Sequence, residues 1–397
     1  MAIDFPNSPT SGQIFTSGDK SWIWDGTVWK AYGASLSPTV LKVDSTNTRV
    51  GINNQSPAYT LDVNGTVEAT QFLQGTDYLT PYTGFRNAII NGDFRINQRA
   101  FTSLTTGAYF FDRWTFGNNT GTVTVSSQSF TVGSPAATGY ESPTFARQVT
   151  SGQSGVDALA YIAQNIEDVR TFANSTITIS FWAKAASGTP KIAIELLQGF
   201  GSGGSPSSTV LTYVGQVTLS TSWTRYSVTT TVPNINGKTL GTTANTSSLQ
   251  LQFWTSAGSN FNSRTGSLGI QNNTFDFWGV QVERGSVATP FEQRPIQTEL
   301  ALCQRYYHRH YSGDGNMKRC VVAQAYTYWT QEFFHPVEMR ASPTVTIYNS
   351  ALTAGNYDPD GGGVSNAVTA RADKRGFAFY STVTRNGEFW YTASAEF

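Results

Sequence analysis

Charged side chains are scarce in this sequence. Lys, Arg, Asp and Glu make up 13% of its 397 residues, which is about half the usual share for a soluble domain. The 26 basic and 26 acidic side chains cancel. No basic block stands out, and this argues against a nucleic-acid partner, because binding phosphates requires clustered Lys and Arg. The surface should be polar but uncharged, and suited to hydrogen bonding and ring stacking.

Long apolar runs are also missing. No stretch approaches the ~20 apolar residues of a membrane-spanning helix, so we expect no insertion into a membrane. Residues 1–10 lack the basic start and apolar run of a signal peptide, and we therefore expect the chain to be made and folded in a cytoplasm.

Cysteine and histidine are few. Cys303 and Cys320 are too few for a disulfide framework, and are either two buried thiols or one bonded pair. The three histidines are His308, His310 and His335, and no GxSxG, HExxH, P-loop or CxxC motif is present. We expect no enzyme.

Hydrolysis of a glycan by two carboxylates remains an alternative. Nothing in the spacing of the acidic residues selects a pair. The candidates are Glu167, Asp168, Glu195, Asp276 and Glu283.

Gly, Ser, Thr and Asn are abundant, and aromatic residues reach 13%. Apolar and polar residues alternate between frequent turn signals, which is typical of strands. The sequence therefore predicts a mainly β fold, and for residues 84–292 it predicts a jelly-roll β-sandwich. Two strands carry the clearest core faces. These are formed by Ile177, Ile179, Phe181 and Ala183 in one strand and by Leu249, Leu251 and Phe253 in the other.

Three further regions flank the sandwich. Residues 1–33 carry three tryptophans around an Asp-Gly turn and predict a small β module. Residues 34–83 predict a linker and a short β shaft, whose apolar surface is too small for one chain to close a core; three copies about a common axis would solve this. Residues 293–397 predict one helix over 293–311, with an apolar stripe at 3.6-residue spacing, and then a smaller β domain at the tip.

Aromatic residues on polar strand faces are the candidate binding residues. Trp182 lies on the face opposite the core of its strand, as do Gln250, Gln252 and Trp254 on theirs. A Trp among amides and hydroxyls can stack on a pyranose while the amides bond its hydroxyls. Packing of these tryptophans against another domain or subunit is the alternative. In the tip domain the candidates are Tyr326, Tyr328 and Trp390, which core packing would explain equally well.

Several segments resemble parts of bacteriophage tail fibres. FPNSPTSGQIFTSGDKSWIWDGTVWKAYG (5–33) resembles a small N-terminal module, and RVGINNQSPAYTLDVNGTVEA (49–69) resembles a fibre repeat. NAIINGDFRINQRA (87–100), followed by FFDRW, is similar to the opening of a jelly-roll domain. VERGSVATPFEQRPIQTELALCQRYY (282–307) is similar to its closing stretch, and FFHPVEMRASPTVTIYN (333–349) to the strand that follows. The order of these motifs, with a fibre repeat before a jelly roll, is the stronger signal.

The resemblance implies a homotrimeric fibre in the virion tail. Its N-terminal module would join a tail or baseplate protein, and its C-terminal half would bind a host surface polysaccharide, multivalently and without catalysis. Jelly-roll carbohydrate-binding modules often carry a structural Ca²⁺ between the first and last strands, where this sequence has Asp93 and Asp276. Asp93 could instead cap a turn. A bacterial carbohydrate-binding or adhesion module is the alternative function, and a glycan-hydrolysing tailspike is a third.

Overall fold

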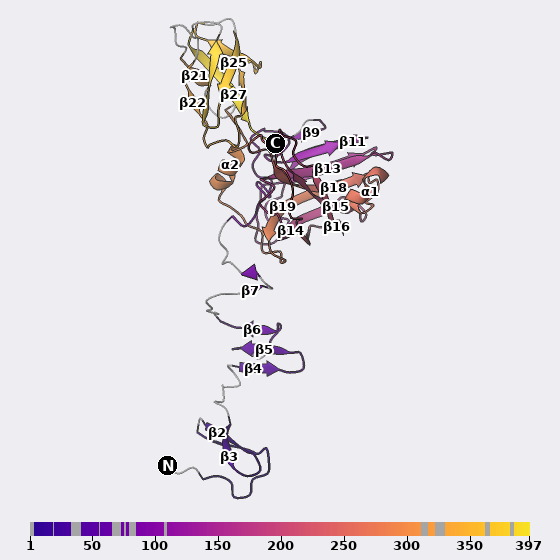
Figure 1. The fold of residues 1–397 in the computed structure, drawn as a ribbon, viewed down its shortest axis with the longest axis vertical. Coiled ribbons are helices and arrows are strands. Elements are labelled where there is room, and N and C mark those ends of the chain that lie inside the picture. The colour runs from indigo at the N-terminus through magenta and orange to yellow at the C-terminus, as the bar shows by residue number, and fades with distance from the viewer. Residues whose placement is uncertain are drawn as a thin grey trace. The chain divides into compact units, whose positions relative to one another are not determined.

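The computed structural model describes residues 4–18, 20–32, 41–54, 56–65, 73–74, 77–78, 85–106, 109–310, 317–321, 330–361, 366–381 and 385–397. The chain is mainly β, as the alternation predicts, and divides into two compact units, residues 1–81 and 82–397 (Figure 1). Among the described residues, no helix has the length and apolar character needed to cross a membrane.

The first unit begins with a three-stranded meander of β1 (Ile14–Ser17), β2 (Lys20–Trp24) and β3 (Trp29–Tyr32). Asp25 organises the turn between β2 and β3, because its carboxylate accepts the backbone N–H groups of Thr27 and Val28, both at 2.8 Å. Aromatic rings make the small core of this module. They belong to Phe5, Phe15, Trp22 and Trp29, with neighbouring ring centroids 5.2–6.1 Å apart.

A second small sheet in this unit consists of β4 (Leu41–Asp44), β5 (Arg49–Ile52) and β6 (Leu61–Val63), followed by the short pair β7 (Leu73–Gln74) and β8 (Asp77–Tyr78). Several of its apolar side chains face solvent in the single chain. Val43 is 62% exposed, Tyr59 73% and Leu61 57%.

The second unit contains the expected jelly-roll β-sandwich, in which every strand pairing is antiparallel. One sheet has the order β10-β13-β18-β15-β16 and the other β17-β14-β19-β12-β11-β9. The strands are β9 (Ser103–Leu104), β10 (Thr115–Asn118), β11 (Thr122–Ser129), β12 (Thr144–Ser151), β13 (Leu159–Glu167), β14 (Thr176–Ala185), β15 (Lys191–Gly199), β16 (Val210–Thr218), β17 (Thr224–Thr231), β18 (Ser248–Ala257) and β19 (Thr274–Arg284).

The two sheets enclose one core. The apolar faces predicted from alternation are confirmed: Ile177, Ile179 and Phe181 from β14 pack in the same buried cluster as Leu249 and Phe253 from β18. Between β18 and β19 the chain forms the turn η1 (Ser259–Phe261) and the short helix α1 (Asn262–Thr265).

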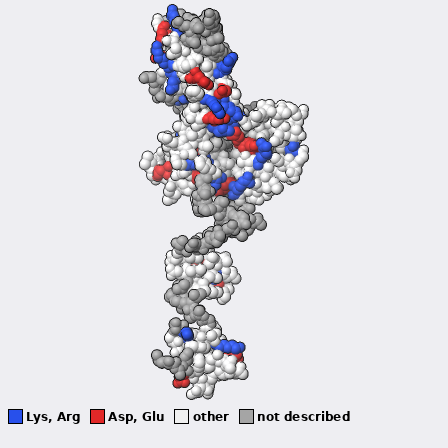
Figure 2. All heavy atoms as spheres, turned by 60° about the vertical axis from the view of Figure 1, so that its left-hand side comes forward, with Lys and Arg blue, Asp and Glu red and all other residues white. Residues whose placement is uncertain are grey.

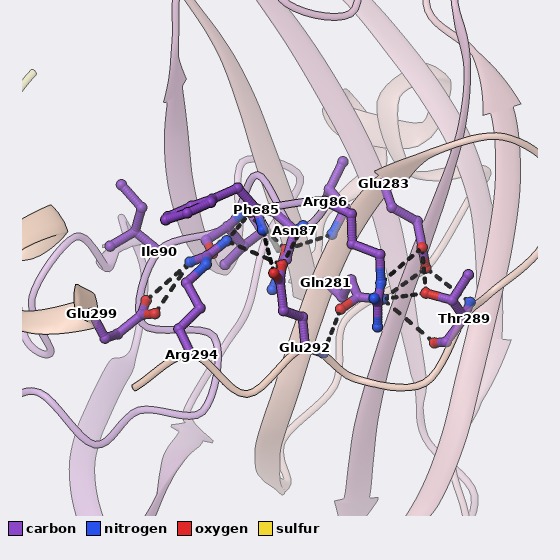
Figure 3. A network of polar contacts seen from close by, with 12 residues as sticks. Phe85, Arg86, Asn87, Ile90, Gln281, Glu283, Thr289, Glu292, Arg294 and Glu299 are labelled. Carbon is purple, nitrogen blue, oxygen red and sulfur yellow. Dashed lines mark hydrogen bonds and ion pairs between the residues drawn. The ribbon is translucent and has the colours of Figure 1, made fainter. Parts of the chain in front are cut away.

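A network of hydrogen bonds and ion pairs, which we call the polar clasp, joins the chain segment before the first strand of the sandwich to the segment that follows its last strand (Figure 3). Glu292 accepts the backbone N–H of Asn87 at 2.8 Å, and Arg294 donates to the backbone carbonyl of the same residue. Arg294 also bonds Glu299 at 3.2 Å, while Glu283 accepts the N–H of Thr289 at 3.0 Å. Residues 283–299 are thereby fixed across the sandwich.

The helix α2 (Ile296–Gln304) is shorter than the predicted helix over 293–311. The chain turns at Arg305, and Tyr307–His310 form the strand β20, which pairs with β27 (Gly387–Ser394). The prediction of a helix was wrong beyond residue 304, because the backbone N–H and C=O groups of β20 form their hydrogen bonds with β27 there. His308 and His310 therefore lie on a strand.

The remaining strands complete the C-terminal β domain around a core of aromatic residues. They are β21 (Lys318–Cys320), β22 (Phe333–Phe334), β23 (Thr344–Tyr348), β24 (Asn356–Pro359), β25 (Asn366–Ala372) and β26 (Gly376–Ser381). Cys303 and Cys320 are both buried and unbonded.

The C-terminal domain is tied to the sandwich by buried charges and rings. Arg113 is 1% exposed, pairs with Glu396 and lies 3.4 Å from the ring centre of Tyr306. The Tyr306 hydroxyl donates to Glu167, which also pairs with Arg305 at 2.8 Å. This junction therefore lies at the end of β13.

Candidate functional site

The outer face of the six-stranded sheet is covered by the chain itself. Trp182 does lie opposite the core, as predicted, but it is only 8% exposed, so its expected role as an exposed sugar platform is wrong. It packs against Trp278 and Phe291 at centroid distances of 5.3 and 6.4 Å. Phe291 belongs to the segment that the polar clasp fixes. The alternation in the sequence could not reveal that Phe291 would cover Trp182.

The outer face of the five-stranded sheet carries the other candidates. Strand register orders its side chains in rows that run across the strands. The first row contains Tyr161, Trp254 and Ala193. The second contains Ala163, Gln252, Glu195 and Tyr213, and the third Asn165, Gln250, Leu197 and Leu211. We call the second and third rows the amide face. Gln250 and Gln252 thus lie on the opposite side of the sandwich from Trp182.

The α1 turn packs over the first row. Trp254 is 1% exposed, so it is a buried anchor and not the exposed ring that alternation suggested. Phe261 packs on its ring at 5.2 Å, and its Nε1–H donates to Glu195 at 2.9 Å. Arg264 donates to both oxygens of Glu195 at 2.8 and 2.9 Å. The turn thereby covers the tryptophan and neutralises the buried carboxylate.

Tyr213 supports the same turn. Gly266 has a φ of +60°, and a Cβ there would lie 2.4 Å from the Tyr213 ring. Only glycine therefore lets the chain pass so close to the ring. Tyr213 is still 40% exposed, which leaves ring surface available at the open edge of the sheet.

Side-chain amides run along the middle of the face. Gln252 donates to Gln250 at 2.5 Å, and Gln250 donates to Asn165 at 3.3 Å. Gln252 is 3% exposed, and its carbonyl oxygen is buried without a hydrogen-bond partner. A buried acceptor without a partner loses about 1–3 kcal/mol relative to a satisfied one, so this oxygen is a place where a donor would be favoured.

The fourth row meets the junction with the C-terminal domain. Ser248 lies opposite Glu167 in the strand register and donates to Asn165 at 3.1 Å. Glu167 is held by Arg305 and Tyr306. The amide face is therefore bounded along the strands by the α1 turn at one end and by this junction at the other.

Charge is unevenly spread over the second unit. In the view of Figure 2, blue and red side chains gather where the sandwich meets the C-terminal domain, while much of the visible sandwich is white. On the amide face, the charged side chains are Glu195 and its partner Arg264, which cancel.

In the C-terminal domain, Trp390 is 8% exposed and lies 5.3 Å from His310, so it is a packed ring and not an open platform. Tyr326 and Tyr328 lie outside the described residues. His308 is bonded to His335 at 2.8 Å in a buried pair, and burial, followed by the nearby charge of His335, lowers the pKa of His308 to about 3.

The two candidate calcium ligands have other partners. Asp276 accepts two bonds from Arg147 at 2.7 and 2.9 Å, and Asp93 pairs with Arg95 at 2.9 Å. Burial raises the pKa of Asp93 to about 6. Within the described ranges, no three His, Cys, Asp or Glu side chains gather as a metal site. Each of the two carboxylates thus has an arginine as its partner in this structure.

Alternation alone identified Gln250 and Gln252 but missed Glu195, Arg264, Asn165 and Tyr213. Glu195 was named only as a possible hydrolytic acid. Its place in KIAIELLQG, between core residues Ile194 and Leu196, was a signal that it shares the polar face. Nothing in the sequence showed that a turn about 70 residues later would supply its arginine.

No protein-family model and no curated protein sequence matches the chain. Solved structures do match it. The enzymatically active domain of tailspike protein 4 from bacteriophage CBA120 is 13% identical over 50% of this chain and 22% of its own, with a TM-score of 0.30. A CBM22-1 xylan-binding domain from Paenibacillus barcinonensis is 13% identical over 50% and 94%, with a TM-score of 0.27. A family 11 carbohydrate-binding module from Clostridium thermocellum is 11% identical over 48% and 99%, with a TM-score of 0.28.

Proposed function

We propose that this chain is a phage tail fibre that attaches the virion to its host by binding a cell-surface glycan at the amide face. The observation that carries the proposal is the series of side-chain amides Asn165, Gln250 and Gln252 in the same rows as the exposed side chains of Leu211 and Tyr213.

The chemistry of the amide face suits a sugar. Each side-chain amide offers both a donor and an acceptor, as each sugar hydroxyl does. The amide face and a sugar can therefore pair through hydrogen bonds between neutral groups. Tyr213, 40% exposed, adds a ring at the edge on which the apolar side of a pyranose can stack. Leu197 and Leu211 supply apolar surface between the polar groups.

Binding without turnover is part of the proposal. The five acidic residues considered for hydrolysis all have partners: Glu167 with Arg305, Asp168 with Arg170, Glu195 with Arg264, Asp276 with Arg147, and Glu283 with Thr289. These partnerships support a structural role for the five carboxylates. The fibre role itself rests on the resemblance of residues 5–33 and 49–69 to tail-fibre segments.

The test is binding of the full-length chain to immobilised host polysaccharide by surface plasmon resonance, at low and high salt. We expect saturable binding with little salt dependence, because the amide face carries no net charge, and no shortening of the polysaccharide after incubation. A steep loss with salt would indicate an ionic receptor instead, and shortened chains would show a hydrolase. The adhesion-module alternative predicts the same binding; flanking baseplate and lysis genes would separate the two.

A further inference from the structure

The outer face of the six-stranded sheet carries more positive than negative side chains. Its strands present Arg147, Lys184 and Arg225 on that face against the carboxylates of Asp276 and Glu283. The amide face differs, because its charged side chains cancel. The excess charge lies in one row, in which Arg147 of β12, Asp276 of β19 and Lys184 of β14 are directly opposite one another in the strand register. We call it the cationic row.

The cationic row is partly exposed. Phe291, which covers part of this sheet, packs on Trp182, in the row next to it. The side chain of Arg147 is 33% exposed and that of Lys184 is 29% exposed, whereas Asp276 between them is 4% exposed. Both cations therefore reach the surface, while the carboxylate is buried.

One of the two cations satisfies the carboxylate. Arg147 donates to both oxygens of Asp276 at 2.7 and 2.9 Å. The ammonium of Lys184 lies 3.7 Å from Oδ2, which is beyond hydrogen-bond distance. Because Arg147 and Lys184 approach the same oxygen, their nitrogen atoms are no further apart than the sum of the two distances to Oδ2. A single anionic group can therefore accept a hydrogen bond from each cation.

Aromatic rings lie at the Lys184 end of the cationic row. Trp223 directly precedes Thr224, the first residue of β17, and so continues the row beyond Lys184. The Lys184 ammonium lies 5.4 Å from the centre of the Trp223 ring, and Phe130 packs against that ring at 5.6 Å. Both rings are partly exposed. They offer apolar surface on which the apolar side of a sugar can lie.

We propose that the cationic row and these two rings form a second binding site, which takes a sugar that carries a carboxylate or phosphate group. The anionic group accepts hydrogen bonds from Lys184 and Arg147, and the ring of the same sugar lies against Trp223 and Phe130. The site lies on the opposite sheet from the amide face and does not depend on sugar binding there.

The preference for an anion follows from the surroundings of Lys184. No side chain in the described part of the chain accepts a hydrogen bond from its ammonium, and the neighbouring carboxylate of Asp276 already has a counter-ion in Arg147. An anionic group can therefore accept a charge-assisted hydrogen bond from Lys184 without displacing an existing one. A neutral hydroxyl would form a weaker bond and would leave the excess positive charge unbalanced.

Calorimetry of the full-length chain tests the site. The acidic probes are trigalacturonate, which carries carboxylates, and glucose 6-phosphate; galactotriose and glucose are the neutral counterparts. We expect at least one acidic probe to bind, with an affinity that falls as the salt concentration rises. The neutral probes report on the amide face, so their binding should not change with salt. Inorganic phosphate, which has the charge but no sugar ring, should bind more weakly than glucose 6-phosphate.

Lys184→Gln removes one charge and leaves the Arg147–Asp276 pair in place, so the fold should be unchanged. We expect it to weaken binding of the acidic sugar about tenfold, the value of one charge-assisted hydrogen bond. Trp223→Leu should weaken the same binding about threefold to tenfold and leave that of inorganic phosphate unchanged. The matched control is Lys191→Gln, at an exposed lysine that begins β15 in the other sheet, and it should bind as the unaltered chain does.

Three results would overturn the inference. Acidic sugars that bind Lys184→Gln as tightly as the unaltered chain would show that the site lies elsewhere. Inorganic phosphate that binds as tightly as glucose 6-phosphate would show that the rings take no part. Failure of both acidic probes to bind would rule the site out. The proposed function is tested separately, by neutral sugars and the amide face, and survives each of these results.

Discussion

Arg264 grips Glu195 with two parallel hydrogen bonds, from Nε to Oε1 at 2.8 Å and from Nη2 to Oε2 at 2.9 Å, although the two residues lie 69 positions apart. Glu195 is completely buried in the middle of a sheet face and also accepts the indole N–H of Trp254. This pair holds the α1 turn on the sandwich and so bounds the amide face at one end.

Removing the carboxylate should loosen the turn. We expect Glu195→Ala to lower the free energy of unfolding by about 2–4 kcal/mol, because it leaves the Trp254 N–H without an acceptor and Arg264 without its counter-ion. Urea unfolding followed by tryptophan fluorescence measures this. Asp168→Ala is the control, since it breaks an exposed pair with Arg170 and should cost less than about 1 kcal/mol. An equal decrease in the free energy of unfolding for the two variants would show that the buried pair stabilises the fold no more than the exposed pair does.

Asp93 should make the sandwich less stable as pH rises. Burial raises its pKa to about 6, above the value of about 3.9 expected in the unfolded chain. The folded state therefore holds the proton more tightly, and the free energy of unfolding falls as pH increases from about 4 to about 6. The difference between the unaltered chain and Asp93→Asn should change by about 2–3 kcal/mol across this window. Parallel curves for the two proteins would contradict the assignment.

The His308–His335 pair should act in the opposite direction. Burial lowers the pKa of both rings, to about 3 for His308, so the unfolded chain takes up protons at a higher pH than the folded one. The contribution of neutral, bonded histidines is present above about pH 6.5 and is lost as the pH falls below it. Hydrogen exchange of the β20 amides, measured from pH 7 to pH 4, should show weakening protection, and His308→Gln should flatten that change. Protection that does not vary with pH would rule out this role.

The small sheet of residues 41–63 should drive association into a trimer. Val43, Tyr59 and Leu61 are 57–73% exposed in the single chain, and burying such surface stabilises an assembly by about 25 cal/mol per Å². Light scattering of the full-length chain should give three times the monomer mass, and Val43→Asp should shift the equilibrium toward smaller species. Val132→Glu is a control at a more exposed valine, 94% exposed, outside this sheet. A monomer for the unaltered chain would refute the trimer.

The N-terminal module should join the fibre to the virion. Deleting residues 1–33 should leave a trimer that still binds cells but is no longer incorporated into phage particles. The motivation is the resemblance of residues 5–33 to modules at fibre N-termini. Immunoblotting of purified particles measures incorporation, and particles that still carry the shortened chain would show that attachment uses another region.

The sequence by itself determined the β class of the chain and the core faces of the sandwich strands. A period of two in β14 and β18 places Ile177, Phe181, Leu249 and Phe253 inward, because successive side chains in a strand point to opposite faces. The same reasoning correctly assigned Gln250 to an outer face. Polar composition also indicated a surface dominated by amides and hydroxyls rather than by ions.

Only the tertiary structure decided which outer face stays open. The alternation in the sequence places Trp182 and Trp254 on outer faces, where we expected them to be exposed. Each is instead covered by a segment outside its own strand, Trp182 by Phe291 and Trp254 by Phe261. A periodic pattern reports the side of a strand on which a residue lies and contains no information on what later packs over that side. For the same reason, α2 is shorter than the apolar spacing predicted. Residues 307–310 pair as a strand with β27, which lies about 80 residues further along the chain and which the local spacing could not reveal.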